Sequence, residues 1–364
     1  SSEIWVLTAG AAGKSQMQVY KLDWRSNQTL ARMSSDGTAG LQGIQYDRAK
    51  DLVLISSVNR STNKVRLLTD DKGALKTVAD GLGSFTAGAL AHNEQVAAVP
   101  LIYDNKLAIV NLADGRTISA LPTGIAPFGA LINKEGTVAF VSNWGGRVSA
   151  PKDLTAPTGL QPTADRVVID AQGKAATGTV TRLDLASGKA THTIPVELHP
   201  TAVLWDEARN RLYVANGNKD SVSVIDTVKN QVVNTIVLQP FEKAVRGIAP
   251  TALALSGDGS RLYVACGGIN TVAVVDVASS KIAGLIPTAW YPNGLSLSSD
   301  GSHLAVSTLL GAGSGWQDAK QKRYVHAYRG SVAVIPIPDA GQLNSYSTAV
   351  AENNHLRLEA ASAA

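Results

Sequence analysis

Apolar and polar residues alternate along most of this chain in short runs, with the period of a β-strand. The clearest runs are "RLYVAN" and "SVSVID" within residues 211–226, and "RLYVAC" and "TVAVVD" within residues 261–276. Clusters of Gly, Asn, Asp and Ser separate the runs, which is typical of hairpin turns. The pattern predicts an all-β chain of short antiparallel strands.

The strands recur in units of about 40 to 50 residues. "HPTAVLW" (199–205) is echoed by "APTALAL" (249–255) and then by "YPNGLSL" (291–297). Each of these runs begins a unit with up to four strands, and one such unit cannot bury both faces by itself. Units stacked around an axis can bury both, which is the principle of a β-propeller. We count seven units and predict that residues 1–364 form a single seven-bladed β-propeller of four-stranded antiparallel blades.

The two ends of the chain are predicted to complete the ring. The first unit, "EIWVLTAG", starts at what should be a second strand. Near the other end, residues 339–354 are expected to form a short helix that Asp339 caps, with Gln342 at the spacing of a capping box. Leu343, Tyr346 and Val350 fall on one face of it. The next segment, "HLRLE" (355–359), alternates like a strand, and we predict that this closing tail supplies the strand missing from the first unit.

Two insertions interrupt the repeat, at about 147–177 and 311–330. Both replace the turn between the second and third strands, which has only four residues in the other units ("GNKD", "GGIN"). They should therefore rise on the same face of the ring. Long loops in compact domains are usually functional or disordered. The second insertion carries aromatic and basic residues together.

This loop-rich face supplies the candidate ligand-binding residues. Aromatic rings mixed with cations suit an anionic or ring-bearing ligand. The candidates are Asn143, Trp144, His199, Asn216, Lys219, Arg246, Asn270, Trp290, Tyr291, Asn293, Trp316, Tyr324, His326 and Arg329.

Charge and composition narrow the partner classes. Lys plus Arg number 33 against 29 for Asp plus Glu, a net charge of +4. So small an excess is no nucleic-acid signature, although Lys219, Arg246 and Arg329 beside aromatic rings could contact a single strand. No apolar run reaches the roughly 18 residues of a membrane span. Cys266 is the one cysteine, so the chain forms no internal disulfide.

No catalytic motif stands out in the sequence. Gly-x-Ser-x-Gly and His-Glu-x-x-His are both absent. "TAGAAGKSQ" (8–16) ends like a phosphate-binding loop, but a strand pattern follows it instead of the helix that such a loop needs. The six histidines are not spaced as ligands on one element, yet a propeller axis could bring His199 and His326 together around a metal. No cofactor is required by the sequence.

The stretch from about residue 178 to 354 resembles the YVTN-type repeat of YncE-like bacterial β-propellers. The residues that carry the resemblance are "LYVAN" with "SVSVID", and "LYVAC" with "TVAVVD". The ending "RGSVAVIPIPDAGQLNSYSTAVAENN" is similar to the propeller half of two-part proteins that also carry a phosphoesterase domain. The resemblance implies an exported protein, periplasmic or extracellular. The abrupt start "SSEIWVLTAG" gives the same expectation, that an export signal has been removed.

Two classes of function stay open. The leading interpretation is a non-catalytic propeller that binds a small anionic or aromatic ligand, or a protein partner, on its loop-rich face. The alternative is an enzyme of the hydrolase, lactonase-like or oxidoreductase type with its site at the propeller mouth, possible with or without a metal. The discriminating feature is a titratable cluster with shifted pKa values near the axis. The ligand, the oligomeric state and any phosphoesterase partner are not determined by the sequence.

Overall fold

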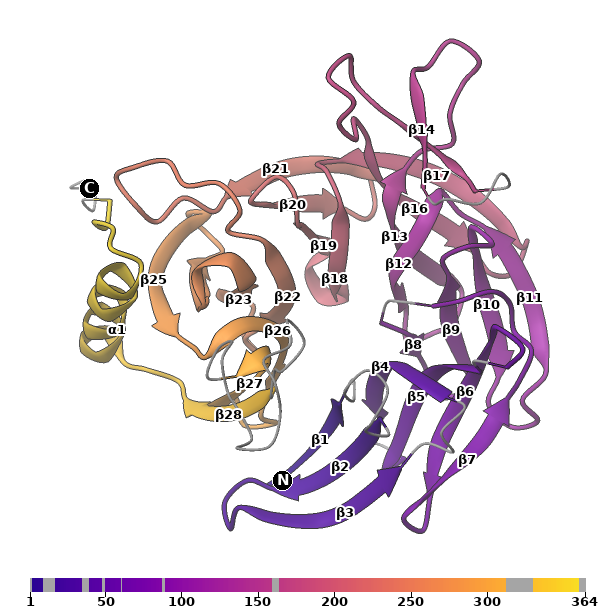
Figure 1. Ribbon diagram of the computed structural model, residues 1–364, viewed down its shortest axis with the longest axis horizontal. Helices are drawn as coiled ribbons and strands as arrows, with labels where there is room; N and C mark the ends of the chain where they lie inside the picture. Colours follow the sequence, from indigo (N-terminus) through magenta and orange to yellow (C-terminus); the bar gives the residue numbers. More distant parts are fainter. Residues whose placement is uncertain are drawn as a thin grey trace, which may run out of the picture.

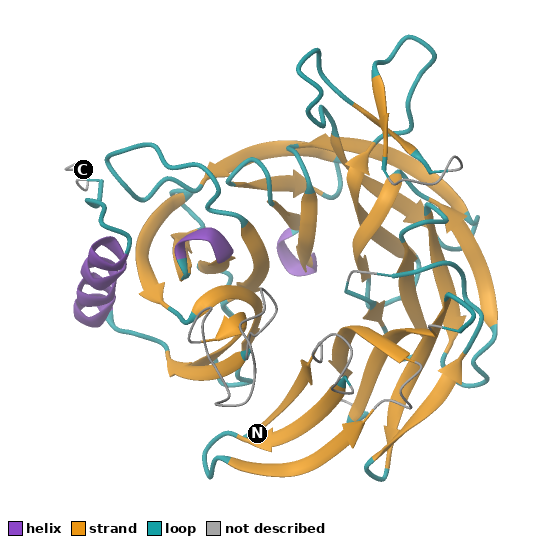
Figure 2. Ribbon diagram, in the orientation of Figure 1, coloured by secondary structure: helices purple, strands orange, loops and turns teal. Residues whose placement is uncertain are grey.

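The computed structural model describes residues 2–8, 17–34, 39–47, 50–59, 61–86, 89–158, 164–311 and 330–359, with the backbone alone at 39–41. Within these residues, seven antiparallel sheets follow one another around a ring in chain order (Figures 1 and 2). This is the predicted seven-bladed propeller. Five blades have four strands, and the first and last have three.

Blades 1 to 4 contain the first seventeen strands of the chain. In blade 1 these are β1 (Glu3–Thr8), β2 (Gln18–Asp23) and β3 (Gln28–Ser34), and in blade 2 they are β4 (Ala39–Asp47), β5 (Leu52–Asn59), β6 (Lys64–Asp71) and β7 (Ala74–Ala79). Blade 3 holds β8 (Ala91–His92), β9 (Val96–Leu101), β10 (Lys106–Asn111) and β11 (Thr117–Pro122). Blade 4 holds β12 (Ile125–Ile132), β13 (Val138–Gly146), β16 (Gly178–Asp184) and β17 (Lys189–Val196), with β14 (Thr155–Pro157) and β15 (Arg166–Val168) forming a separate small hairpin.

Blades 5 to 7 contain the clearest repeats. Blade 5 holds β18 (Pro200–Asp206), β19 (Arg211–Asn216), β20 (Ser221–Asp226) and β21 (Gln231–Val237), and blade 6 holds β22 (Pro250–Leu255), β23 (Arg261–Cys266), β24 (Thr271–Asp276) and β25 (Lys281–Pro287). Blade 7 holds β26 (Trp290–Leu297), β27 (His303–Gly311) and β28 (Ser331–Pro336). Two short 3-10 turns, η1 (Glu207–Arg209) and η2 (Gly267–Ile269), and one helix, α1 (Ala340–Asn353), complete the described elements.

The repeated sequences have the same register in successive blades. Arg211 lies opposite Asp226 in blade 5, and Arg261 lies opposite Asp276 in blade 6. Both pairs form ion pairs, with nitrogen–oxygen distances of 2.9 and 3.4 Å. The sequence repeat is therefore a structural repeat, residue by residue. We call positions that correspond in this way sister positions.

The core lies between the blades. Six apolar clusters fill the junctions in turn, from blades 1 and 2 to blades 6 and 7, and a smaller seventh cluster of Ile102, Ile125 and Ala126 also lies between blades 3 and 4. In blades 5 and 6 the second and third strands are the most buried, and Leu212, Val214 and Val264 are fully inaccessible. Tyr213 of blade 5 packs toward blade 6, while Leu212 and Val214 pack toward blade 4. A blade is thus stable because both of its faces are covered by its neighbours.

The C-terminal helix has the predicted cap. Asp339 accepts a hydrogen bond from the backbone N–H of Gln342 (2.8 Å), and the Gln342 side chain accepts one from the backbone N–H of Asp339 (3.2 Å). Leu343 and Tyr346 pack between blades 6 and 7, and Val350 is buried in the cluster of blades 5 and 6. The helix lies against β25, the outer strand of blade 6.

The predicted closing tail is wrong. Residues 355–359 do not join blade 1, because a bridge pairs Leu358 with Phe241 in the connection between blades 5 and 6. Backbone hydrogen bonds from Glu242 N–H to the Arg357 carbonyl and from Glu359 N–H to the Pro240 carbonyl fix this position. The physical reason is the helix, which leaves the chain outside blade 6, where Leu356 and Leu358 find apolar partners.

Among the described residues, no helix is long and apolar enough to cross a membrane.

Neighbouring blades are also joined by polar contacts. The Asn270 side-chain oxygen, from the turn between β23 and β24, accepts a hydrogen bond from the backbone N–H of Tyr291 at 2.9 Å. Asn105 and Asp220 make the same contact to Ala126 (2.8 Å) and Ala249 (3.0 Å). All three acceptors have left-handed backbone conformations, with φ of 51°, 50° and 54° for Asn105, Asp220 and Asn270. Asn and Asp tolerate this conformation better than other side chains do.

We expect Asn270→Ala to lower the free energy of unfolding by about 1–3 kcal/mol, because it removes an acceptor from a partly buried amide and places Ala in a left-handed position. Asn270→Asp keeps the hydrogen-bond acceptor and tolerates the left-handed conformation, so its free energy of unfolding should fall much less. Urea unfolding followed by circular dichroism measures both variants. Equal losses in the two would show that this contact does not hold blades 6 and 7 together.

Candidate functional site

One mouth of the ring gathers most of the candidate residues, and we call it the loop-rich mouth. It is formed by the turns between second and third strands and by the connections that lead into each inner strand. The described turns are 61–63, 102–105, 144–177 (with a gap at 159–163), 217–220 and 267–270, and the connections are 82–86, 123–127, 197–200, 238–250 and 288–292. As predicted, the insertion at 147–177 lies here, between β13 and β16 of blade 4. The second insertion runs from β27 to β28, hence from the same end of blade 7, but residues 312–329 lie outside the described part.

A recurring left-handed residue lies ahead of the inner strand or within its first two residues in blades 3 to 7. These lead-in residues are Phe85, Ala126, His199, Ala249 and Tyr291, with φ between 49° and 59°. Four of them precede proline, as in "HPT" and "APT". This conformation is costly for a residue with a side chain, so it persists only where surrounding contacts impose it. The polar contacts from Asn105, Asp220 and Asn270 impose it in blades 4, 6 and 7.

His199 is held in another way. The four-residue turn that would carry an Asn or Asp for it is replaced in blade 4 by the insertion. Instead, the His199 ring lies against the Trp144 ring, with centroids 4.8 Å apart and planes inclined by 35°. Trp144 is at the end of β13 and 42% exposed. In blade 5 the lead-in residue therefore has an aromatic contact with the exposed Trp144 ring, where other blades have a hydrogen bond from the lead-in N–H to an Asn or Asp.

A second aromatic pair lies at the same mouth and was missed by the sequence reasoning. Phe85, the lead-in residue of blade 3, stacks on Tyr103 with centroids 5.2 Å apart and planes inclined by 22°. Tyr103 is in the turn after β9 and is 66% exposed. Its place in the repeat could have indicated Phe85, because Phe85 is the sister of His199 and Tyr291. It was hidden because "SFTAG" lacks the proline of the other lead-ins.

Blade 7 presents Trp290 and Tyr291 at this mouth. Trp290 is 46% exposed. The Tyr291 ring lies over Gly267 so closely that a Cβ at that glycine would be about 3.0 Å from the ring. Asn293 is exposed, and its side-chain oxygen accepts a hydrogen bond from the Ser307 hydroxyl at 3.2 Å. Of these three candidates, Trp290 offers the largest accessible apolar surface.

Two candidate asparagines are buried beneath the mouth and do not line it. Asn143 is fully buried: its oxygen accepts from the Gly124 N–H (3.0 Å) and its amide donates to the hydroxyls of Thr179 and Thr181. Asn216, at the sister position in blade 5, is fully buried and donates to the hydroxyls of Ser221 and Ser223. The reason is their position toward the end of a second strand, where neighbouring strands cover them.

The basic candidates lie beside the same turns. The Lys219 ammonium is 4.0 Å from Glu197, at the limit of an ion pair. Arg246 is exposed in the connection between blades 5 and 6, and within the described residues no acidic group pairs with it. Its neighbour Gly247 donates to the Asp220 carboxylate at 2.8 Å, which fixes the backbone there. The exposed guanidinium is therefore carried on a restrained backbone.

The insertion has its own ionic clamp at its base. Arg147 donates two hydrogen bonds to Asp153, at 2.6 and 2.8 Å. This bidentate pair, helped by the Ala150 N–H, lowers the pKa of the Asp153 carboxyl to about 2. Gly146 makes the turn possible: its φ is +79°, and a Cβ there would be about 2.5 Å from the Thr177 carbonyl. Val167 from the small hairpin packs on Ile125 and Ala126 at the mouth.

Four further candidates, Trp316, Tyr324, His326 and Arg329, lie outside the described residues. The proposed His199–His326 pairing is therefore not addressed by the structure. Among the residues that are described, no group of three His, Cys, Asp or Glu comes together as metal ligands would.

The shifted carboxylates do not gather at the loop-rich mouth. Besides Asp153, the strongest shifts occur at Asp258 and Asp300, in the turns between first and second strands at the opposite mouth. Hydrogen bonds from Ser256 and Ser260 lower the pKa of Asp258 to about 2. A buried His–carboxylate pair, His92 with Asp47 at 3.6 Å, joins blades 2 and 3, also at the end of an inner strand away from this mouth. The predicted sign of an enzyme was a cluster of shifted groups near the axis, and in the described chain the strongest carboxylate shifts lie apart from one another, at Asp153, Asp258 and Asp300.

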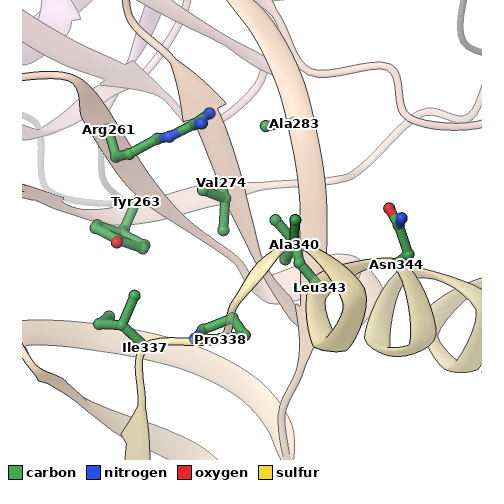
Figure 3. Close-up of a pocket in the computed structure, with 9 residues that line it drawn as sticks. All are labelled: Arg261, Tyr263, Val274, Ala283, Ile337, Pro338, Ala340, Leu343 and Asn344. Carbon is green, nitrogen blue, oxygen red and sulfur yellow. The ribbon is translucent and has the colours of Figure 1, made fainter.

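A small cleft lies elsewhere, between blades 6 and 7 and the start of α1 (Figure 3). Its volume is about 220 Å³, and its lining includes Tyr263, Val274, Ile337 and Leu343. It lies where blade 7 lacks a fourth strand and the helix covers blade 6 instead. The cleft is mainly apolar and belongs to the packing of the helix.

The comparisons identify the fold and no family. No family model and no curated protein matches the chain. Among solved structures, the chain is similar to one titled "Kuenenia stuttgartiensis Hydrazine Synthase", with a TM-score of 0.65 and 12% identity, covering 91% of this chain and 94% of that one. Likeness at this identity shows a shared propeller fold alone, because propellers support many unrelated activities.

Cys266 is fully buried at the end of β23 in blade 6. Burial raises the pKa of its thiol to about 12, so at pH 8 roughly one thiol in ten thousand is ionised. We expect the native protein to resist Ellman's reagent for hours and the urea-unfolded protein to react within minutes, with Cys266→Ala as the blank. Rapid reaction of the native thiol would mean that it is accessible and activated.

Proposed function

We propose that this protein is a non-catalytic binding propeller whose loop-rich mouth holds a planar, anionic ligand. The observation that carries the proposal is that two half-buried lead-in residues at sister positions of one mouth each contact an exposed aromatic ring. Trp144 with His199 and Phe85 with Tyr103 each combine a lead-in residue and a turn residue. Trp290 adds a third exposed ring. Rings that are already stacked lose little conformational freedom when a planar ligand binds.

The anionic character of the ligand follows from the cations beside these rings. Arg246 is exposed with no acidic partner in the described chain, and Lys219 is only loosely paired. The net charge of +4 adds a weak general attraction for anions. Aromatic carboxylates and aryl phosphates combine both properties. A protein partner that presents such groups on a loop would satisfy the same contacts.

The cellular location and family remain part of the proposal. We infer an exported protein of the YVTN type, and the support is the resemblance of residues 178–354 to the repeats of exported bacterial propellers. Fractionation of the source cells with the full natural gene product would test the location. Recovery in the cytosol would contradict it.

A thermal-shift screen of aromatic carboxylates, aryl phosphates, inorganic phosphate and sugars tests the site. A compound at a hundred times its dissociation constant stabilises by about 2.7 kcal/mol, which amounts to a rise of a few degrees in melting temperature. We expect Trp144→Ala and His199→Ala to weaken a binding compound at least about tenfold, because each loses half of a stacked pair. Arg246→Ala should weaken the anionic compounds and spare neutral ones.

The chain provides a matched control at the opposite mouth. Trp24 and His303 form a similar ring contact, with centroids 4.7 Å apart, between blades 1 and 7. Trp24→Ala should lower stability without changing the affinity. Equal loss of binding in Trp24→Ala and Trp144→Ala would remove the loop-rich mouth as the site. The absence of any shift in the wild type would exclude the small-molecule form of the proposal.

A further inference from the structure

In blade 6 the backbone at the lead-in residue binds a carboxylate from the neighbouring blade. The Asp220 side chain accepts hydrogen bonds from the N–H groups of Gly247 (2.8 Å) and Ala249 (3.0 Å), one on each carboxylate oxygen. Ala249 is the lead-in residue, with φ of 54°. Neighbouring N–H groups around a left-handed residue form a small concave site for an anion. Asp220 therefore shows that this backbone conformation accepts a carboxylate.

Blade 5 has the same backbone at its lead-in residue. The Leu198 and His199 carbonyls accept hydrogen bonds from the next turn of their own blade, at 3.3 and 2.9 Å, and the two sister carbonyls in blade 6 do the same, both at 2.9 Å. The φ of His199 is 52°. In a trans peptide the N–H points away from the carbonyl of the same planar unit. The His199 N–H is therefore directed toward blade 4, as the Ala249 N–H is directed toward blade 5.

In blade 5 these N–H groups meet no acceptor. Within the described residues, the backbone N–H groups of Glu197, Leu198 and His199 donate no hydrogen bond. Thr177 lies at the sister position of Asp220, directly ahead of a third strand, but it is not left-handed. A β-branched side chain disfavours that conformation. The Thr177 hydroxyl is itself buried without a partner, and because buried polar groups are nearly always paired, this junction has a place for a ligand oxygen.

The lead-in residues of the other blades differ in this respect. In blades 4 and 7 the lead-in N–H donates to Asn105 and Asn270, at 2.8 and 2.9 Å. In blade 3 the residue ahead of the lead-in, Ser84, donates its N–H to the Asp104 carboxylate at 2.7 Å, so a negative charge already lies there. Among the described lead-ins, blade 5 is the one that combines unpaired N–H groups with no bound carboxylate.

The aromatic pair lies beside these donors. Trp144, whose ring contacts the His199 ring, is at the end of β13 in blade 4, the side toward which the His199 N–H is directed. The Glu197 side chain opposes an anion here, but its carboxylate is 4.0 Å from the Lys219 ammonium, which reduces the repulsion. A ring stacked on Trp144 can therefore carry an attached carboxylate to the backbone.

We propose that the anionic group of the ligand is a carboxylate, bound by the backbone N–H groups of Glu197 and His199 in the way that blade 6 binds Asp220. The ring of the ligand lies against Trp144, so the ligand is an aromatic carboxylate. At neutral pH an aryl phosphate carries more than one negative charge, and the excess would lie beside the Glu197 carboxylate. This inference rests on the proposed function, because it names the chemical group that the loop-rich mouth takes.

The probes are benzoate, benzamide and phenyl phosphate, which share one ring and differ in charge and shape. In an NMR titration we expect benzoate to bind at least about tenfold more tightly than the other two. Benzoate should move the amide protons of Glu197 and His199 downfield, because a hydrogen bond to a carboxylate deshields them. The amide proton of Ala249, which already donates to Asp220, should stay in place.

Two variants test the assignment to the backbone. Thr177→Asp supplies an internal carboxylate at the sister position of Asp220, and Asp tolerates the left-handed conformation better than Thr does. It should raise the melting temperature and weaken benzoate binding at least about tenfold, because the two carboxylates compete for the same N–H groups. Ala176→Asp adds the same charge at the adjacent exposed residue and should bind benzoate as the wild type does. Equal affinities of the two variants would contradict the assignment.

The failure of this inference can be told from that of the proposed function. Equal binding of all three ring compounds that is lost in Trp144→Ala, with unmoved amide protons at Glu197 and His199, would keep the loop-rich mouth as the ligand site and overturn the carboxylate assignment. Movement of these protons by acetate as readily as by benzoate would support the backbone site and contradict the planar ligand. Unmoved protons with every compound would overturn the inference.

Discussion

The packing of blade against blade is the interaction on which the rest of this structure depends. A single four-stranded sheet of these sequences has two apolar faces, and only neighbours on both sides can cover them. Phe140 of blade 4 and Trp205 of blade 5 meet edge to face across one junction, with centroids 4.8 Å apart. Such contacts bury the second and third strands of blades 5 and 6 almost completely. They also orient every blade alike, which brings all turns of one kind to one mouth.

The loop-rich mouth is a consequence of that orientation. Each connection must pass from the outer strand of one blade to the inner strand of the next. In blades 3 to 7 it does so through a left-handed residue, which precedes proline in four of the five cases. The conformation has a cost, and Asn105, Asp220 and Asn270 offset it through hydrogen bonds from the neighbouring turn. In blade 4 the insertion has removed that turn, and Trp144 contacts His199 instead. A structural requirement of the ring thus leaves aromatic side chains at the mouth.

The fold could be predicted because its cause is repetitive. "RLYVAN" and "RLYVAC" recur because they form equally buried strands in two blades. The capping box at Asp339 marks the start of the helix by local sequence alone. The closing tail could not be predicted, because "HLRLE" alternates in the same way whichever edge it meets. Its position was decided by the packing of α1 on β25, which is a tertiary effect. Asn143 and Asn216 look like ligands in sequence because they are polar at a strand end, and burial gave them hydrogen-bonding roles instead.

The distribution of exposure suggests how function should be sought in a repeat protein. Positions that keep the repeat, such as Leu212 and Leu262, are buried and serve the junctions. The lead-in position differs between sisters: it holds Phe, Ala, His, Ala and Tyr in successive blades, and all of these except Ala126 are half-buried. Because the repeat accounts for stability, its departures are free to serve recognition.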